Sequence, residues 1–171
     1  MKNQLDSRIC SSLRKRIVFH STRYRGTHDQ VGKAWITFDN EMIQDFYTIN
    51  RKYKRNTLAS ELRKQSHSTN DSEPAQRENY YRASRFADKE MVRQGIHSQH
   101  EFYNAVEEYL NLSTNEALTS TNPIIRALSI LDRRLGKRRL ISIRDDHPIV
   151  NKLLIIRLLV EYFDLQEINL S

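Results

Sequence analysis

Two histidines and several charged residues gather in one short stretch near the N-terminus, where they could take part in acid–base chemistry. The stretch runs from residue 17 to 39, and its candidate residues are His20, Arg23, Arg25, His28 and Asp29. Paired histidines can pass protons, and arginines can stabilise a pentavalent phosphate, as in a metal-independent ribonuclease. No spacing that this chemistry requires is met, and β-hairpins often carry such residues by chance. We therefore predict no catalytic residue.

A second pair of histidines, His97 and His100, has a carboxylate beside it in Glu101. Such a set can bind a metal ion. However, Ser98 and Glu101 also have the spacing of a capping box, which accounts for the glutamate without a metal. The chain has only four glycines and no Walker loop, Rossmann glycine pattern or nucleophile elbow. We predict neither a metal site nor a cofactor.

The densest basic cluster follows a predicted helix near the C-terminal third of the chain. Five of the seven residues from 133 to 139 are basic: Arg133, Arg134, Lys137, Arg138 and Arg139. They can satisfy helix-end carbonyls and pair with acids such as Asp132. They can also contact the phosphates of nucleic acid or another polyanion, which supplies affinity without sequence specificity. The sequence leaves both interpretations open.

The second basic cluster surrounds an aromatic residue. Its members are Arg51, Lys52, Tyr53, Lys54 and Arg55. Cations interleaved with an aromatic ring can hold a nucleic-acid backbone and stack one base. Alternatively, Tyr53 packs inward and the cations are solvated.

Composition bounds the class of protein. The 171 residues include 28 basic and 21 acidic side chains, a net charge of +7, with 38% hydrophobic residues. By segment, the net charge is +7 for residues 1–60, −3 for 61–121 and +3 for 122–171. The basic ends can attract phosphates, or the acidic middle of this chain or of a second copy.

The cellular compartment is predicted from the membrane, secretion and disulfide signals of the sequence. No apolar run approaches the length of a membrane helix, and the N-terminus has no apolar signal-peptide core. Cys10 is the single cysteine, so no internal disulfide can form. We expect a cytoplasmic protein with no membrane partner.

The elements that must position these residues follow from hydrophobic periodicity. A short helix is predicted over 2–15, with Leu5, Ile9 and Leu13 on one face. Strands are predicted over 17–25 and 33–38, with a tight turn at Asp39-Asn40 and a candidate third strand over 42–46, which gives a sheet of two or three strands. A short helix around Leu58 and Leu62 precedes a polar segment, 64–76, which we expect to be a mobile loop.

From residue 77 the chain is predicted to be largely helical. Capping boxes begin at Ser98 and Ser113, and Asn122-Pro123 opens a helix expected to end at 135 with Gly136 in the left-handed region. Leu128 and Leu131 lie on its apolar face and are predicted to be core residues. A last helix runs from about Pro148 to 163.

These elements predict an α+β fold in which a short N-terminal helix and a small antiparallel β-meander pack on a C-terminal bundle of about four helices. The chain is predicted to be a single domain, 1–171. Within it we expect an α/β part over 1–63 and a helical part over 77–171, separated by the loop 64–76.

Several short segments together resemble a known family. They are Tyr24-Arg25, His28-Asp29, Gly32–Asp39, Phe102–Ala105, Tyr109–Leu112, Asn122–Leu128 and, most specifically, Leu131–Leu140, LDRRLGKRRL. The chain resembles a family of small, basic, uncharacterised bacterial proteins, in which the turn at Asp39-Asn40 is usually Asp-Gly. Because that family has no established activity, the resemblance assigns no catalytic or binding residue. It implies a cytoplasmic bacterial protein.

The leading functional hypothesis is a non-enzymatic binding module whose basic faces contact nucleic acid or an acidic protein. One alternative is a small metal-independent nuclease centred on the 17–39 hairpin. Another is a structural protein that self-associates through opposite charges. The sequence leaves open the ligand and the oligomeric state.

Overall fold

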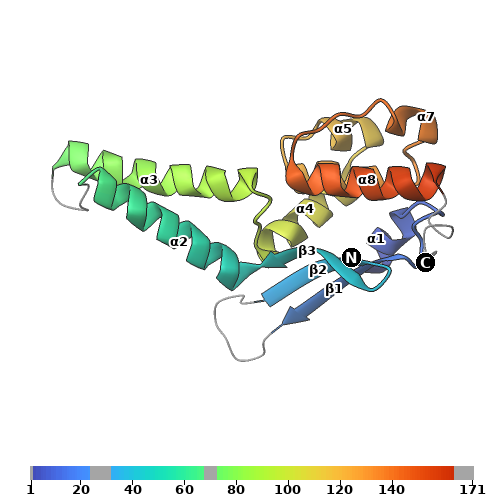
Figure 1. Ribbon diagram of the computed structural model, residues 1–171, viewed down its shortest axis with the longest axis horizontal. Coiled ribbons are helices and arrows are strands. Elements are labelled where there is room, and N and C mark those ends of the chain that lie inside the picture. Colours follow the sequence, from blue (N-terminus) through green and yellow to red (C-terminus); the bar gives the residue numbers. More distant parts are fainter. Residues whose placement is uncertain (1, 24–31, 68–72, 164–171) are drawn as a thin grey trace, which may run out of the picture.

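The α+β fold predicted from the sequence is confirmed by a computed structural model that describes residues 2–23, 32–67 and 73–163 (Figure 1). A short N-terminal helix is followed by a three-stranded meander and then by helices. In chain order the elements are α1 (Lys2–Arg8), β1 (Ile17–Arg23), β2 (Gly32–Phe38), β3 (Glu41–Tyr47), α2 (Thr48–Gln65), α3 (Pro74–Arg93), α4 (Gln99–Asn111), α5 (Thr114–Thr119), α6 (Pro123–Leu131), α7 (Lys137–Leu140) and α8 (Pro148–Tyr162).

The sheet is an antiparallel meander in the order β1-β2-β3. The predicted turn between β2 and β3 is confirmed, because Asp39 and Asn40 have φ of 48° and 71°. Two consecutive residues with positive φ form the hairpin turn whose twist matches that of the flanking strands. The predicted loop between β1 and β2 lies outside the described residues, apart from Gly32.

Helix α4 covers one face of the sheet, where aromatic side chains build the contact. The ring of Phe102 on α4 lies 4.3 Å from that of Phe46 on β3 and 6.4 Å from that of Phe19 on β1, centroid to centroid. The predicted face of the N-terminal segment also joins this core, since Leu5, Ile9 and Leu13 are all buried. Thus the sheet has the helical cover that so small a meander needs.

The start of α4 is tied to the open end of the sheet by a buried glutamine. The Gln99 side-chain amide donates to the carbonyls of Thr22 (2.8 Å) and Lys33 (3.1 Å), on neighbouring strands. A Cβ on Gly32 would lie 1.8 Å from Oε1 of Gln99. Glycine at position 32 therefore leaves room for this cross-link.

Helix α6 forms the centre of the helical layer and packs against α4, α5 and α8. Its predicted N-cap is confirmed, because Oδ1 of Asn122 accepts from the backbone N–H of Ile124 at 3.0 Å. The predicted core residues Leu128 and Leu131 are both buried.

The predicted end of this helix is wrong. Helix α6 stops at Leu131, four residues early, and Gly136 has φ of −71° rather than a left-handed value. Gly136 instead precedes α7. The reason is a side-chain cap: Oδ1 of Asp132 accepts from the backbone N–H of Arg134 at 2.8 Å, which turns the chain out of the helix.

A buried arginine satisfies the carbonyls that this early end exposes. Arg157 of α8 is only 2% exposed and donates to the carbonyl oxygens of Ile130, Asp132 (2.9 Å) and Leu135 (2.6 Å). Its charge is balanced by Glu161, one turn further along α8, at 2.9 Å. A single guanidinium thus replaces the backbone partners that a longer α6 would have supplied.

Asp132 links the same point to two further elements. Its carboxylate is fully buried and accepts from the Tyr109 hydroxyl of α4 at 2.6 Å and from the Arg134 guanidinium. Burial alone would raise the pKa of Asp132, but these two hydrogen bonds outweigh burial and hold the pKa below its ordinary value. Backbone hydrogen bonds from Cys10 to Leu131 and from Arg133 to Arg8 attach the N-terminal segment.

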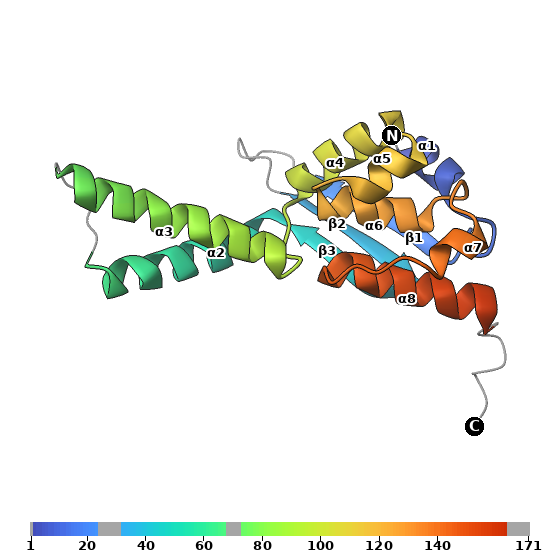
Figure 2. The same cartoon turned by 90° about the horizontal axis from the view of Figure 1, so that it is seen from above.

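Helices α2 and α3 form an antiparallel hairpin that projects from one end of the molecule (Figures 1 and 2). We call this hairpin the arm, residues 48–65 and 74–93, and the remaining elements the body. The predicted short helix around Leu58 is longer than expected, and the predicted loop over 64–76 is shorter, because α2 ends at Gln65 and α3 begins at Pro74. Residues 68–72 lie outside the described residues.

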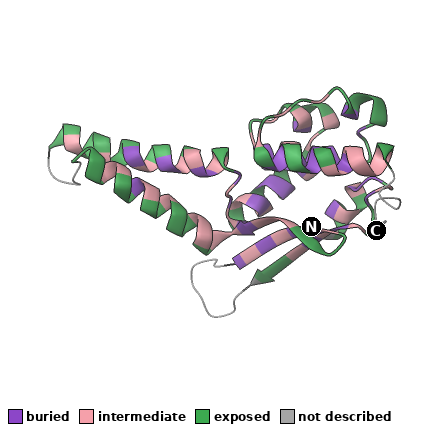
Figure 3. Cartoon of the chain, in the orientation of Figure 1, coloured by how far each residue is buried: buried purple, intermediate pink, exposed green. Residues whose placement is uncertain are grey.

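The arm is held together by small side chains and stacking. Ala59 of α2 and Ala83 and Ala87 of α3 are buried, whereas buried positions are otherwise sparse along the arm (Figure 3). The Arg63 guanidinium lies 3.6 Å from the centroid of the Tyr80 ring. The predicted single domain, and its predicted division into two parts at 64–76, both stay predictions. In the structure, the segment between Gln65 and Pro74 connects α2 and α3, which pack on each other.

We expect Arg157→Met to lower the free energy of unfolding by about 3–5 kcal/mol, because it removes the side-chain donor from the buried carbonyls of Ile130 and Leu135 and leaves the Glu161 carboxylate without its positive partner. Chemical denaturation followed by circular dichroism measures the change. Arg138→Met serves as the control, since Arg138 is exposed and should change stability by less than about 0.5 kcal/mol. Equal losses in the two variants would contradict this role for Arg157.

Candidate nucleic-acid interface

The residues with possible acid–base chemistry in the 17–39 hairpin are only partly described. His20 is half-buried on β1, where its ring stacks on Trp35 with centroids 5.0 Å apart. Its Nε2 lies 3.0 Å from Oγ1 of Thr37. Arg25, His28 and Asp29, and the side chain of Arg23, lie outside the described residues. The nuclease alternative therefore gains no supporting contact from His20.

The two members of the second histidine pair, His97 and His100, lie in different environments. His100 is exposed and bonds to Asn104 at 3.2 Å, whereas His97 is buried. The predicted capping box is confirmed: Glu101 accepts from the backbone N–H of Ser98 at 2.7 Å, and its own N–H donates to the Ser98 hydroxyl. In the described ranges, no three His, Cys, Asp or Glu side chains are placed to hold a metal ion.

His97 lies where the arm joins the body. Its ring is 6.4 Å from that of Phe46 and 6.0 Å from that of His147, and no hydrogen bond reaches its Nε2 from any described residue. Burial lowers the pKa of His97 to about 4; the Glu101 carboxylate opposes this shift, while His147 and Arg51 add to it. The residue is therefore neutral at physiological pH and acts as a packing element of this joint.

The cluster at 133–139 is partly structural. Arg134 pairs with the buried Asp132, and Lys137 donates to the Glu161 carbonyl at 3.3 Å. Arg139 bonds to the Asn115 side chain. Among the described residues, the exposed side chains of Arg133 and Arg138 make no hydrogen bond or ion pair. The structural interpretation thus holds for Arg134, while the phosphate-contact interpretation of the cluster stays a prediction.

The cluster at 51–55 divides between two sides of α2. Arg51 and Arg55 face α3 and pair with Asp88, at 3.5 and 3.1 Å, and Arg51 also reaches Glu101 at 2.8 Å. The inward packing considered for Tyr53 is wrong, because its side chain is 70% exposed. Lys52 and Lys54 are exposed beside it. The two neighbouring arginines, by contrast, brace the arm.

The two clusters lie far apart. Helix α7, with Lys137–Arg139, is at the end of the body opposite the arm in both views (Figures 1 and 2). They cannot together form one compact site.

The arm carries a large positive net charge, which the net charges of residues 1–60, 61–121 and 122–171 do not reveal. Its two helices hold eleven basic and four acidic side chains, a net charge of +7, which equals the net charge of the whole chain. The rest of the chain has seventeen of each sign. Hence all of the protein's excess positive charge belongs to the element that projects furthest.

Most of the acids in the arm are already paired. Asp88 pairs with α2, while Glu78 and Glu90 pair within α3 with Arg85 and Arg93. Seven basic side chains of the arm make no ion pair in the described structure: Lys52, Lys54, Arg63, Lys64, Arg77, Arg82 and Lys89. Apart from Arg63, which stacks on Tyr80, these cations are available to an external anion.

Sequence reasoning missed the α3 members of this set. Arg82 and Lys89 lie seven residues apart and fall on one helix face with Phe86 between them, although they form no contiguous cluster. The signal that could have found them is helical spacing of cations around an apolar residue.

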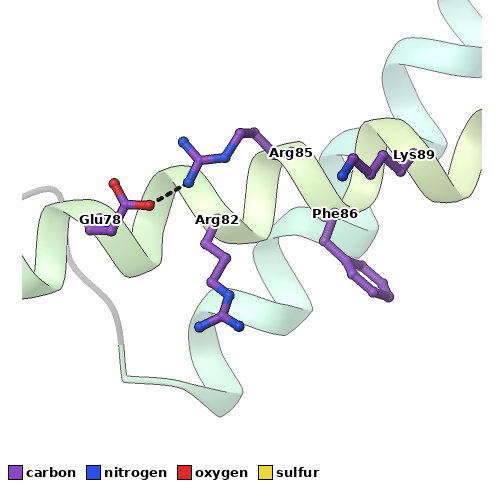
Figure 4. Close-up of a pocket in the computed structure, with 5 residues that line it drawn as sticks. All are labelled: Glu78, Arg82, Arg85, Phe86 and Lys89. Carbon is purple, nitrogen blue, oxygen red and sulfur yellow. Dashed lines mark hydrogen bonds and ion pairs between the residues drawn. The ribbon is translucent and has the colours of Figure 1, made fainter.

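These side chains line a shallow groove on α3 (Figure 4). Its volume is about 370 Å³, and its lining residues are Glu78, Arg82, Arg85, Phe86 and Lys89. Arg82 and Phe86 project from the same side of the helix, and Phe86 is 54% exposed. A second groove, of about 250 Å³ between α2 and α3, shares these two residues.

Fold and surface together define an α+β protein with a basic helical arm. A family model matches residues 1–158, and the chain belongs to the SF0329 protein family. The family-level resemblance found in the sequence is thereby confirmed, while bacterial origin and the specificity of Leu131–Leu140 stay predictions. No curated protein and no solved structure matches the chain. No helix in the described ranges combines the length and apolarity needed to cross a lipid bilayer.

We expect acid to destabilise the protein through His97. The unfolded chain binds a proton near pH 6.5, whereas folded His97 binds one only near pH 4, so stability falls as the pH drops between these values. The loss from this residue approaches about 3 kcal/mol. Unfolding free energies measured from pH 7 to 4 should fall less steeply in His97→Leu than in the wild type.

His100→Leu, which alters an exposed histidine three positions away, is the matched control and should follow the wild-type pH profile. An unchanged profile in His97→Leu would show that folding does not lower the pKa of His97.

Proposed function

We propose that this protein is a non-enzymatic binding module whose arm contacts the phosphate backbone of nucleic acid. The observation that carries the proposal is the concentration of the whole net charge, +7, on the projecting hairpin. A body of balanced charge does not repel a polyanion, while the arm attracts it.

The geometry of the arm favours a long anion over a small one. The unpaired cations are distributed along both helices, from Lys52 near the body to Lys64 and Arg77 near the free end. The two grooves that these cations line on α3 are open and shallow. A regularly spaced series of phosphates satisfies such a layout, and each phosphate contact releases counterions.

Cytoplasmic location and bacterial origin belong to the same proposal. The support for the location is Cys10, a single buried cysteine that forms no disulfide. The resemblance noted above supports the origin.

We expect binding of a labelled duplex oligonucleotide to weaken steeply with salt. The slope of log K against log salt changes by about 0.9 for each phosphate contact on duplex. The triple variant Arg77→Ala, Arg82→Ala and Lys89→Ala should therefore flatten the slope by about two to three units. Alanine is the best helix former, so these changes should leave α3 intact. Fluorescence anisotropy over a salt series measures the slope.

The matched control removes the same charge from α7: Lys137→Ala, Arg138→Ala and Arg139→Ala. It should keep more of the wild-type slope than the arm variant does. If the α7 variant instead loses the slope and the arm variant keeps it, the proposed site is wrong. If the wild type shows no salt-dependent binding at low ionic strength, nucleic-acid binding itself is wrong, and an acidic protein becomes the partner to test.

A further inference from the structure

Phe86 is an apolar side chain in the most polar part of the molecule. It lies on α3 with more than half of its surface exposed, beside the helix face that packs through Ala83, Ala87 and Met91. The arm thus gains little stability from this ring. An exposed phenylalanine among cations is better explained by a ligand with both a flat apolar face and negative charge.

The surroundings of the ring are built for such a ligand. Arg82 lies one turn before Phe86 and Lys89 lies about one turn after it, and neither has an ion-pair partner among the described residues. Seven residues of helix place the Cα atoms of Arg82 and Lys89 about 10 Å apart along the axis. Arg82 projects from the same side of α3 as Phe86, whereas the Lys89 side chain runs back along the helix toward Arg85 (Figure 4). Arg82 and Phe86 line both grooves, so they stand at the boundary between the two hollows.

From this arrangement we infer that the arm binds single-stranded nucleic acid, with an unpaired base stacked on Phe86 and the flanking phosphates held by Arg82 and Lys89. This inference rests on the proposed function and narrows its ligand. Bases in a duplex stack on each other and offer their faces to no side chain, whereas an unpaired base can stack on an aromatic ring. A duplex backbone would use the cations and leave Phe86 exposed.

Two exposed tyrosines lie on other faces of the arm. Tyr81 lies one turn before Arg85 on α3 and is partly exposed, with its ring edge-on to that of Tyr80 at 5.8 Å. Tyr53 projects from α2. Aromatic rings spread along a basic element are the pattern by which proteins bind single strands without sequence preference.

The test compares Phe86→Ala with Phe163→Ala, which removes a phenylalanine of similar exposure, 65%, at the end of α8. Binding of a 20-nucleotide single strand and of a duplex of equal length is followed by anisotropy. Stacking of one base is worth about 1–3 kcal/mol, so Phe86→Ala should weaken single-strand binding by a factor of about 5 to 150. Its salt slope should stay at the wild-type value, because no charge is lost. Duplex binding, and both affinities of Phe163→Ala, should stay unchanged.

A second variant reports on the contact itself. In Phe86→Trp, the tryptophan emission beyond that of Trp35 should be quenched by the single strand and not by the duplex, with single-strand affinity retained. Parallel titrations with RNA and DNA strands of the same sequence decide which nucleic acid is preferred.

Several outcomes would overturn the inference. Equal affinity for duplex and single strand, or full affinity in Phe86→Ala, would leave the arm a phosphate binder only and retain the proposed function. A change of oligomeric state in Phe86→Ala, seen by size-exclusion chromatography without nucleic acid, would assign the groove to a second copy of the chain. Absence of any salt-dependent binding would remove the proposed function together with this inference.

Discussion

The body of this protein depends on how the C-terminal end of α6 is closed. The Arg157 guanidinium reaches three carbonyls there, and Asp132 gathers the Tyr109 hydroxyl and Arg134 at the same place. Helices α4 and α8 and the N-terminal segment all converge on this point. A buried charge without partners would be costly, so this corner folds as a unit with all of these elements present. One member of the basic cluster at 133–139, Arg134, is therefore explained by the need of the buried Asp132 carboxylate for a positive partner.

The body has balanced charge and the arm is basic, and the two parts are stabilised by different interactions. The body buries a continuous apolar core from the sheet to α8. The arm has few buried side chains and relies on alanine contacts, ion pairs and the stack of Arg63 on Tyr80. Its lower density of apolar contacts makes it the less stable part of the fold. Surface that is not needed for packing is thereby available for cations and exposed rings.

Much of the body could be predicted, because its signals are local. Capping boxes at Ser98 and Ser113, the turn at Asp39-Asn40 and the apolar stripe of α6 each depend on residues within a few positions of one another. The early end of α6 could not, since the carbonyls that the Asp132 cap exposes are satisfied by Arg157, which lies more than twenty positions away. The arm was missed for a related reason: polar composition near 64–76 indicates a loop, and cations at helical spacing form no contiguous cluster. The ion pairs of Arg51 and Arg55 with Asp88 likewise form only when α2 and α3 pack together.

Helix α2 follows β3 without an intervening residue, since the strand ends at Tyr47 and the helix begins at Thr48. The direction of the last residues of β3 therefore fixes which side chains of α2 face α3. Each residue of an α-helix turns the side-chain direction by about 100°. A single insertion or deletion at this junction would rotate Arg51 and Arg55 out of the α3 contact and bring the exposed positions beside them inward. Exposed positions of the arm tolerate substitution, whereas insertions or deletions near the sheet are tolerated only in lengths that restore the orientation of α2.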